Sequence, residues 1–174
     1  PVHDFDRLIQ FSRNNHVNLV VVGPEAPLVD GIVDAMQESG LRVFGPSKSA
    51  AQLEGSKIFC KDLLRKADVP TADYRVFRDA ESAITFVNDR FGDEPEVPLV
   101  VKADGLAAGK GVIVCHHRGE VLEAIDRIAS QREFGEAGEQ LVIEERLDGQ
   151  EASVLAITDG RTILTLPAAQ DHKH

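Results

Sequence analysis

The sequence has 174 residues, 43% of them hydrophobic, with 19 basic and 29 acidic residues and a net charge of −10. The length allows one good core or two small ones. The acidic balance argues against a nucleic-acid partner, because an anionic surface repels phosphate backbones. Its apolar runs are far shorter than the ~18 residues of a membrane-spanning helix, and the first residues do not resemble a signal peptide. We therefore expect a cytoplasmic protein with no membrane partner, in which any phosphate site is local and Cys60 and Cys115 are free thiols.

The first part of the chain alternates predicted helices and strands. Amphipathic spacing predicts a helix from about 4 to 14 and another over 28–36, which Gly40 follows as a cap. Continuous apolar runs predict buried strands over 18–22 and 41–44. The order helix, strand, helix, strand predicts the end of an open parallel sheet with helices on its faces.

The pattern of predicted helices and strands changes after residue 45. The patterns predict helices over 47–53, 56–66, 81–91 and 121–129, and strands over 74–77, 98–103, 112–115 and 141–143. Asp159-Gly160, between apolar runs at 152–158 and 161–166, predicts a β-hairpin. We expect an α/β fold that becomes α+β in its second part, with a boundary between Lys66 and Tyr74.

A glycine-rich stretch over 100–112 is the strongest chemical signal. A predicted strand leads to Lys102, and a loop with Gly105, Gly109 and Gly111 follows. Glycines let the backbone approach a ligand and direct N–H groups toward an anion, while Lys102 and Lys110 add the positive charge that a triphosphate needs. The pattern is neither a Walker loop nor a dinucleotide fingerprint, because no helix follows the glycines. The alternative reading is a flexible hairpin with solvated lysines.

A second signal is acidic. The strand predicted over 141–143 runs into Glu144 and Glu145, and Glu151 follows after a turn. The backbone of such an edge can read an adenine, and a later carboxylate can accept the ribose hydroxyls. A solvated acidic turn between two strands remains the alternative.

These two features, in this order, resemble the ATP-grasp fold, and the resemblance extends to the phosphoribosylamine–glycine ligase family, also called glycinamide ribonucleotide synthetases. The matching segments are 22–28, 44–46, 51–57, 102–112, 143–145, 147, 151–153 and 170–173. The resemblance implies the end of an N-terminal substrate-binding α/β domain with linker helices over 1–70. An ATP-grasp lid subdomain would follow over 71–148, and the start of the larger ATP-grasp subdomain over 149–174. We expect the segment to be truncated at both ends.

The resemblance also implies a reaction. ATP would phosphorylate the carboxylate of glycine, and the amine of 5-phosphoribosylamine would attack the acyl phosphate. The implied cofactors are ATP and Mg²⁺ (or Mn²⁺), with metal ligands downstream of His174 and none within this segment, which we therefore expect to be inactive alone. A monomer is favoured. Two alternatives stay open, namely another ATP-grasp ligase or carboxylase and a non-catalytic nucleotide-binding module.

Site residues carry over by matched position. The catalytic positions implied are Lys57 and Lys102, which would contact the phosphates of ATP. Further nucleotide contacts are implied at Gly105, Gly109, Lys110, Gly111, Glu144, Glu145, Leu147 and Glu151, with Glu144 near the adenine amine, the backbone of Glu145 and Leu147 at the adenine edge, and Glu151 at the ribose. The acceptor substrates would contact Gly23, Pro24, Glu25, Asp171 and Lys173. The alternatives are a surface lysine at 57, a helix-capping Glu25 and a solvated tail at 171–173.

Overall fold

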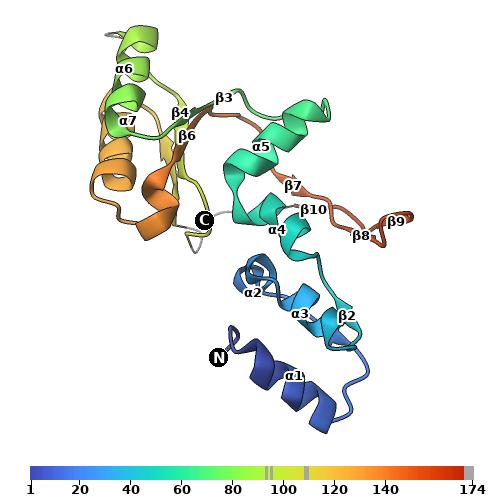
Figure 1. Ribbon diagram of the computed structural model, residues 1–174. Coiled ribbons are helices and arrows are strands. Elements are labelled where there is room, and N and C mark those ends of the chain that lie inside the picture. The colour runs from blue at the N-terminus through green and yellow to red at the C-terminus, as the bar shows by residue number, and fades with distance from the viewer. Residues whose placement is uncertain (93, 95, 108–109, 171–174) are drawn as a thin grey trace.

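The computed structural model describes residues 1–92, 94, 96–107 and 110–170 (Figure 1). Its first part contains α1 (Phe5–Asn14), β1 (Val20–Val21), α2 (Glu25–Asp30), α3 (Ile32–Glu38) and β2 (Val43–Phe44). The strands β1 and β2 pair in parallel, as expected, but the prediction that they are buried was wrong, because Val21 and Phe44 are 66% and 46% exposed. A small core of Ile9, Ile32, Val33 and Met36 holds the helices against this sheet.

The helix predicted over 28–36 is in fact two helices, and that prediction was wrong in its boundaries. Gly31 has a left-handed φ of 99° and separates α2 from α3, a conformation that glycine adopts without steric cost. The first helix also begins earlier, at Glu25 directly after Pro24, where proline ends the preceding extended segment. The apolar spacing continues across the break because both helices bury the same face.

Two linker helices, α4 (Lys48–Gly55) and α5 (Lys57–Lys66), join the two parts of the chain. Ser47 and Ser56 begin them, because each hydroxyl accepts a hydrogen bond from a backbone N–H of the first turn. A single residue, Ser56, lies between the two helices, and α4 packs against α2. The sequence predicted both helices correctly.

A four-stranded antiparallel sheet forms the second part. Its strands lie in the order β3 (Tyr74–Phe77), β6 (Leu141–Glu145), β4 (Leu99–Ala103) and β5 (Val112–Cys115). Helices α6 (Ala80–Phe91) and α7 (Arg118–Ile125) cover one face, while α5 lies on the other side (Figure 1). The predicted helix over 121–129 begins earlier than expected and continues as a π-helical turn, η1 (Asp126–Ser130).

Alternation along β6 divides the sheet into two faces. Leu141 and Ile143 belong to the core beneath α6 and α7, which is the largest apolar cluster of the described residues. The residues between and after them, Val142 and Glu144, therefore face the opposite side, where α5 lies. A short 3₁₀ helix, η2 (Gly135–Glu139), precedes β6 and was not predicted.

The predicted hairpin is present as β8 (Ala156–Thr158) and β9 (Ile163–Thr165), an antiparallel pair. The carboxylate of Asp159 stabilises the turn by accepting hydrogen bonds from the N–H groups of Arg161 and Thr162, at 2.9 and 2.7 Å. The strand predicted over 152–158 is interrupted, because β7 (Ala152–Ser153) pairs with β10 (Ala169–Gln170) instead. None of the described helices is long and apolar enough to cross a membrane.

Candidate nucleotide-binding site

A cleft of ≈ 860 Å³ lies between the linker helices and the glycine-rich loop. This volume is in the range of pockets that hold small ligands, about 300–1,000 Å³. The residues that line it are Glu25, Ala26, Leu53, Glu54, Lys57, Cys60, Lys61, Leu64, Thr71, Lys102, Gly105, Leu106, Ala107, Gly111 and Val112. Lys57 and Lys102, 45 positions apart in the sequence, thus face the same cavity.

Lys57 is the first residue of α5, and its ammonium group reaches the loop. Nζ donates a hydrogen bond to the carbonyl oxygen of Gly105, at 2.8 Å. Burial lowers the pKa of Lys57 from its ordinary value, Asp104 raises it, Lys102 lowers it and Glu54 raises it again. Lys102 lowers the pKa of Lys57 because its positive charge lies close to the ammonium group of Lys57.

Asp104 fastens the loop to the beginning of α5. Its carboxylate accepts hydrogen bonds from Ser56 Oγ, 3.1 Å from each oxygen, and from the N–H of Ile58, at 3.1 Å. The N–H of Asp104 in turn donates to the carbonyl oxygen of Gln140, at 3.0 Å. The carboxylate thus serves the helix N-terminus, where a negative charge is favourable, and it fixes where the loop leaves β4.

Two glycines of the loop are required by geometry. Gly105 has a φ of +97°, which strains any other residue. At Gly111 the restriction is space, because a Cβ atom there would lie 2.6 Å from Cβ of Ala107 and 3.2 Å from Cβ of Ala103. Gly111 therefore packs tightly against Ala107 and against Ala103 at the end of β4.

The register of the sheet brings Lys102 and Glu144 together. Lys102 pairs with Val142 across β4 and β6, so that Glu144, two residues further, is its diagonal neighbour on the same face. The carboxylate of Glu144 forms ion pairs with two amines, that of Lys102 and that of Lys61. The side chain of Glu144 is only 5% exposed, and a carboxylate this buried requires such partners.

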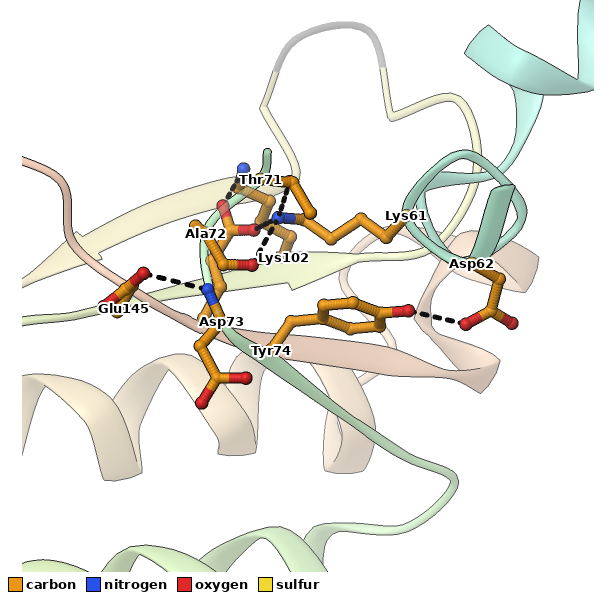
Figure 2. A network of polar contacts seen from close by, with 9 residues as sticks. Lys61, Asp62, Thr71, Ala72, Asp73, Tyr74, Lys102 and Glu145 are labelled. Atoms are coloured by element: carbon orange, nitrogen blue, oxygen red, sulfur yellow. Dashed lines mark hydrogen bonds and ion pairs between the residues drawn. The ribbon is translucent and has the colours of Figure 1, made fainter. Parts of the chain in front are cut away.

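Lys61 reaches this carboxylate from α5, and Figure 2 shows its side chain extending toward Thr71 and Ala72. Besides the ion pair, its Nζ donates to Oγ1 of Thr71 at 3.0 Å and to the carbonyl oxygen of Ala72 at 3.3 Å. Sequence reasoning did not find Lys61. The signal was present, because Lys57 and Lys61 are four residues apart in a correctly predicted helix and therefore share one face.

The residue after Lys61 also contacts the sheet. Tyr74 Oη donates to the carboxylate of Asp62 at 2.6 Å (Figure 2). Tyr74 lies directly opposite Glu144 across β3 and β6, and its ring is 5.3 Å from Nζ of Lys61. Burial and the hydrogen bond to Asp62 raise the pKa of Tyr74. Two consecutive residues of α5 therefore hold the same part of the sheet.

Other predicted nucleotide contacts lie outside this cluster. One carboxylate oxygen of Glu145 accepts a hydrogen bond from the N–H of Asp73, at 2.9 Å (Figure 2). Leu147 is 68% exposed, and Glu151 and Lys110 are exposed as well. The N–H of Lys110 donates to the carbonyl oxygen of Ala107.

The predicted acceptor contacts are divided. Glu25, the first residue of α2, lines the cleft, whereas Pro24 lines a separate apolar depression near α1 and Gly23 is exposed. The predictions for Gly109, Asp171 and Lys173 lie outside the described residues.

Metal-ligating side chains are scattered over the described part of the chain. In the ranges that the structure describes, His, Cys, Asp and Glu side chains nowhere gather in a group of three suited to a metal ion. Both cysteines are free, with Cys60 in the cleft and Cys115 buried in the core.

Two family models cover the chain in order. The one described as "Phosphoribosylglycinamide synthetase, N domain" matches residues 1–54, and the one described as "Phosphoribosylglycinamide synthetase, ATP-grasp (A) domain" matches residues 55–174. The curated phosphoribosylamine–glycine ligase of Rhodopirellula baltica is 66% identical over 171 residues, which are 98% of this chain and 39% of that protein. The chain thus spans less than half the length of this relative.

Solved structures agree with this assignment. The phosphoribosylamine–glycine ligase of Thermotoga maritima has a TM-score of 0.63 at 34% identity, over 73% of this chain and 31% of that one. The biotin carboxylase domain of the Hydrogenobacter thermophilus 2-oxoglutarate carboxylase shares the fold at 18% identity, with a TM-score of 0.72 over 98% of this chain and 38% of that one. The resemblance found in the sequence is confirmed, and the chain belongs to the phosphoribosylglycinamide synthetase family, of which it carries the end of the N domain and the beginning of the ATP-grasp domain.

Proposed function

We propose that the cleft binds ATP, with its phosphates beside the ammonium groups of Lys57 and Lys102. The observation that supports this most directly is that both lysines, from distant parts of the chain, line one cavity beneath a glycine-rich loop. In a chain with a net charge of −10, a cavity lined by three lysines and two glutamates is a local exception. Ammonium groups and backbone N–H groups are the donors that polyphosphates require.

The reaction proposed for the intact protein is the ATP-dependent ligation of glycine to 5-phosphoribosylamine. The γ-phosphoryl group passes to the glycine carboxylate, and ADP leaves. The amine of 5-phosphoribosylamine then attacks the acyl carbon and expels phosphate, which yields glycinamide ribonucleotide. The described lysines would position the phosphates and stabilise the charge that develops on them.

The remaining predictions belong to this proposal. Gly105, Gly109, Lys110 and Gly111 would cover the phosphates, Glu144, Glu145, Leu147 and Glu151 would lie near the adenosine, and Gly23, Pro24, Glu25, Asp171 and Lys173 near the acceptors. We place the subdomains at 1–70, 71–148 and 149–174. Mg²⁺ or Mn²⁺ would be held by residues after 174. Because the segment lacks these ligands, we expect that it does not catalyse the ligation by itself. The free cysteines favour a reducing compartment such as the cytoplasm.

The replacement Lys102→Ala in the intact protein tests the nucleotide site. Loss of a charged hydrogen bond should weaken ATP binding by about 2–3 kcal/mol, measured by calorimetric titration with ATP. Lys66→Ala is the matched control, because Lys66 is an exposed lysine of α5 and should leave the affinity unchanged. Equal affinity of the Lys102→Ala variant and the unmodified protein would refute the proposed site.

The acceptor requires its own test, because the fold alone is shared by ligases and carboxylases. ADP release should depend on glycine and 5-phosphoribosylamine together when a panel of carboxylates and amines is offered to the intact protein. Release driven by another acceptor pair would point to a different ATP-grasp ligase. ATP binding without any acceptor-dependent release would indicate a non-catalytic nucleotide-binding module.

A further inference from the structure

The ammonium group of Lys61 is fully engaged within the protein. It has three N–H donors, and it has three partners, namely Thr71 Oγ1, the carbonyl oxygen of Ala72 and the carboxylate of Glu144. Its side chain is 11% exposed. An ammonium with this set of contacts is already satisfied, so its direct use for a ligand would break existing hydrogen bonds.

Lys102 differs in both respects. Both lysines line the cleft, but the side chain of Lys102 is 24% exposed, and Glu144 is its ion-pair partner among the described residues. If Lys102 and Glu144 stood alone, the carboxylate would cancel the charge of the lysine. A neutral pair attracts a phosphate group only weakly, because the attraction and repulsion nearly balance at the distance of the ligand.

We propose that Lys61 is a positioning residue that neutralises Glu144 and thereby leaves Lys102 free to present a net positive charge to the nucleotide. One carboxylate between two ammonium groups gives a cluster with a net charge of +1. Glu144 can then hold Lys102 in place without cancelling its charge toward the cleft. This inference rests on the proposed function, since it assigns a residue to the same ATP site.

The structure favours this role over that of a simple tether. A tether between α5 and the sheet already exists next to Lys61, because Asp62 accepts a hydrogen bond from Tyr74 at 2.6 Å. The contacts of Lys61 with Thr71 and Ala72 would also hold without a carboxylate. What Lys61 adds beyond these contacts is a second positive charge on Glu144, and that charge can be tested separately from the packing.

The decisive experiment uses four variants of the intact protein, Lys61→Met, Lys61→Arg, Glu144→Gln and the double variant Lys61→Met/Glu144→Gln. Lys61→Met should weaken ATP binding roughly tenfold, the size of a charge interaction of about 1.4 kcal/mol in a partly screened site. Lys61→Arg should retain most of the affinity. The double variant removes the cancelling carboxylate as well and should bind ATP more tightly than Lys61→Met, because Lys102 again carries an uncompensated charge. Part of the loss should remain, because the contacts of Glu144 with Lys102 and with the adenosine are removed too.

Calorimetric titration with ATP gives the affinities, and thermal unfolding of every variant shows which ones fold. Steady-state kinetics should show a raised KM for ATP in Lys61→Met with little change in kcat, as expected for lost ground-state binding. Lys66→Met is the control on the same helix. If Lys61→Met fails to fold, the inference is tested by comparing the double variant with Glu144→Gln. The Glu144→Gln variant has two uncompensated ammonium groups, whereas the double variant has one. Glu144→Gln should then bind ATP more tightly than the double variant.

Two results would overturn the inference. One is an unchanged ATP affinity in Lys61→Met, and the other is a double variant that binds ATP no better than Lys61→Met. The Lys102→Ala variant separates this failure from that of the proposed function. Weakened binding in Lys102→Ala beside unchanged binding in Lys61→Met refutes the role of Lys61 alone, whereas unchanged binding in both refutes the nucleotide site itself.

Discussion

Ser56 and Asp104, 48 residues apart in the sequence, are joined by hydrogen bonds of 3.1 Å from Ser56 Oγ to both carboxylate oxygens. The same hydroxyl accepts from the N–H of Phe59 and so also begins α5. One side chain therefore couples the start of a helix to the base of the glycine-rich loop. Asp104 thus has a structural role in placing Lys57 beside the loop.

The first prediction concerns this coupling. Ser56→Ala should lower the free energy of unfolding of the intact protein by about 1 kcal/mol, the usual effect of losing a helix cap. Asp104→Ala should cost about 1.5–3 kcal/mol, because charged hydrogen bonds are lost. The two effects should not add, with a coupling energy of at least about 0.5 kcal/mol in a double-mutant cycle.

Ser47 provides the control for this cycle. It caps α4 through the N–H of Ala50, so Ser47→Ala should have a similar cost. Its effect should add to that of Asp104→Ala without coupling. Strict additivity of Ser56→Ala and Asp104→Ala, measured by denaturant unfolding, would contradict the link between helix and loop.

The second prediction is a dependence of ATP affinity on pH. Burial lowers the pKa of Lys57 from 10.5, whereas Asp104 raises it. Since the ammonium form would bind phosphate, affinity should fall as the pH rises through this pKa, and in Asp104→Asn the fall should occur at lower pH. Titrations with ATP between about pH 7 and pH 10 would show the shift. In Lys57→Arg the fall should disappear, because a guanidinium keeps its charge. The prediction would be wrong if ATP affinity depended on pH in the same way in the unmodified protein and in Asp104→Asn.

A third prediction follows from the space around Gly111. In Gly111→Ala the new Cβ would meet Ala107 and Ala103 at 2.6 and 3.2 Å, so the loop must move. We expect a raised KM for ATP and a loss of stability of about 1–3 kcal/mol, as in other overpacked sites. Gly119→Ala is the control, because its nearest neighbour is the flexible side chain of His117 at 3.3 Å. Normal ATP kinetics in Gly111→Ala would mean that the loop does not act on the nucleotide.

The fourth prediction uses the two cysteines as internal probes. Cys60 lines the cleft, so bound ATP should slow its alkylation by iodoacetamide. Cys115 is fully buried, and burial together with Glu120 and Glu123 raises the pKa of its thiol to about 11. It should remain unmodified at neutral pH with or without ATP, since alkylation requires the thiolate. Peptide mass spectrometry over time measures both rates, and a Cys60 rate unaffected by saturating ATP would argue against nucleotide in this cleft.

Local patterns predicted most of the secondary structure. The linker helices and the strands of the four-stranded sheet have clear apolar spacing and clear ends, and they were found within a few residues. The error at Gly31 has a simple origin, because a glycine inside an amphipathic pattern lowers helix propensity without revealing a left-handed φ of 99°. The broken strand at 152–158 depends on pairing between β7 and β10, which no local pattern contains.

The site was only partly predicted, because some of its residues stand in sequence motifs and others do not. Lys57, Lys102 and the glycines stand in recognisable motifs, and the structure places both lysines in one cleft. Lys61 belongs to no recognisable motif. Its ion pair with Glu144 becomes apparent only in the structure, where α5 lies over the face of the sheet that presents Glu144. Sequence spacing showed that Lys57 and Lys61 share a helix face, but not what that face contacts.

The attachment of α5 to the sheet at Asp104, Glu144 and Tyr74 has a mechanical consequence. Three separate contacts along one helix oppose its tilting away from the strands. The cleft's opposite wall comes from α2 and α4, through residues such as Glu25 and Leu53. The two walls of the cavity are therefore built on separate helices, with Ser56 as the lone residue between α4 and α5.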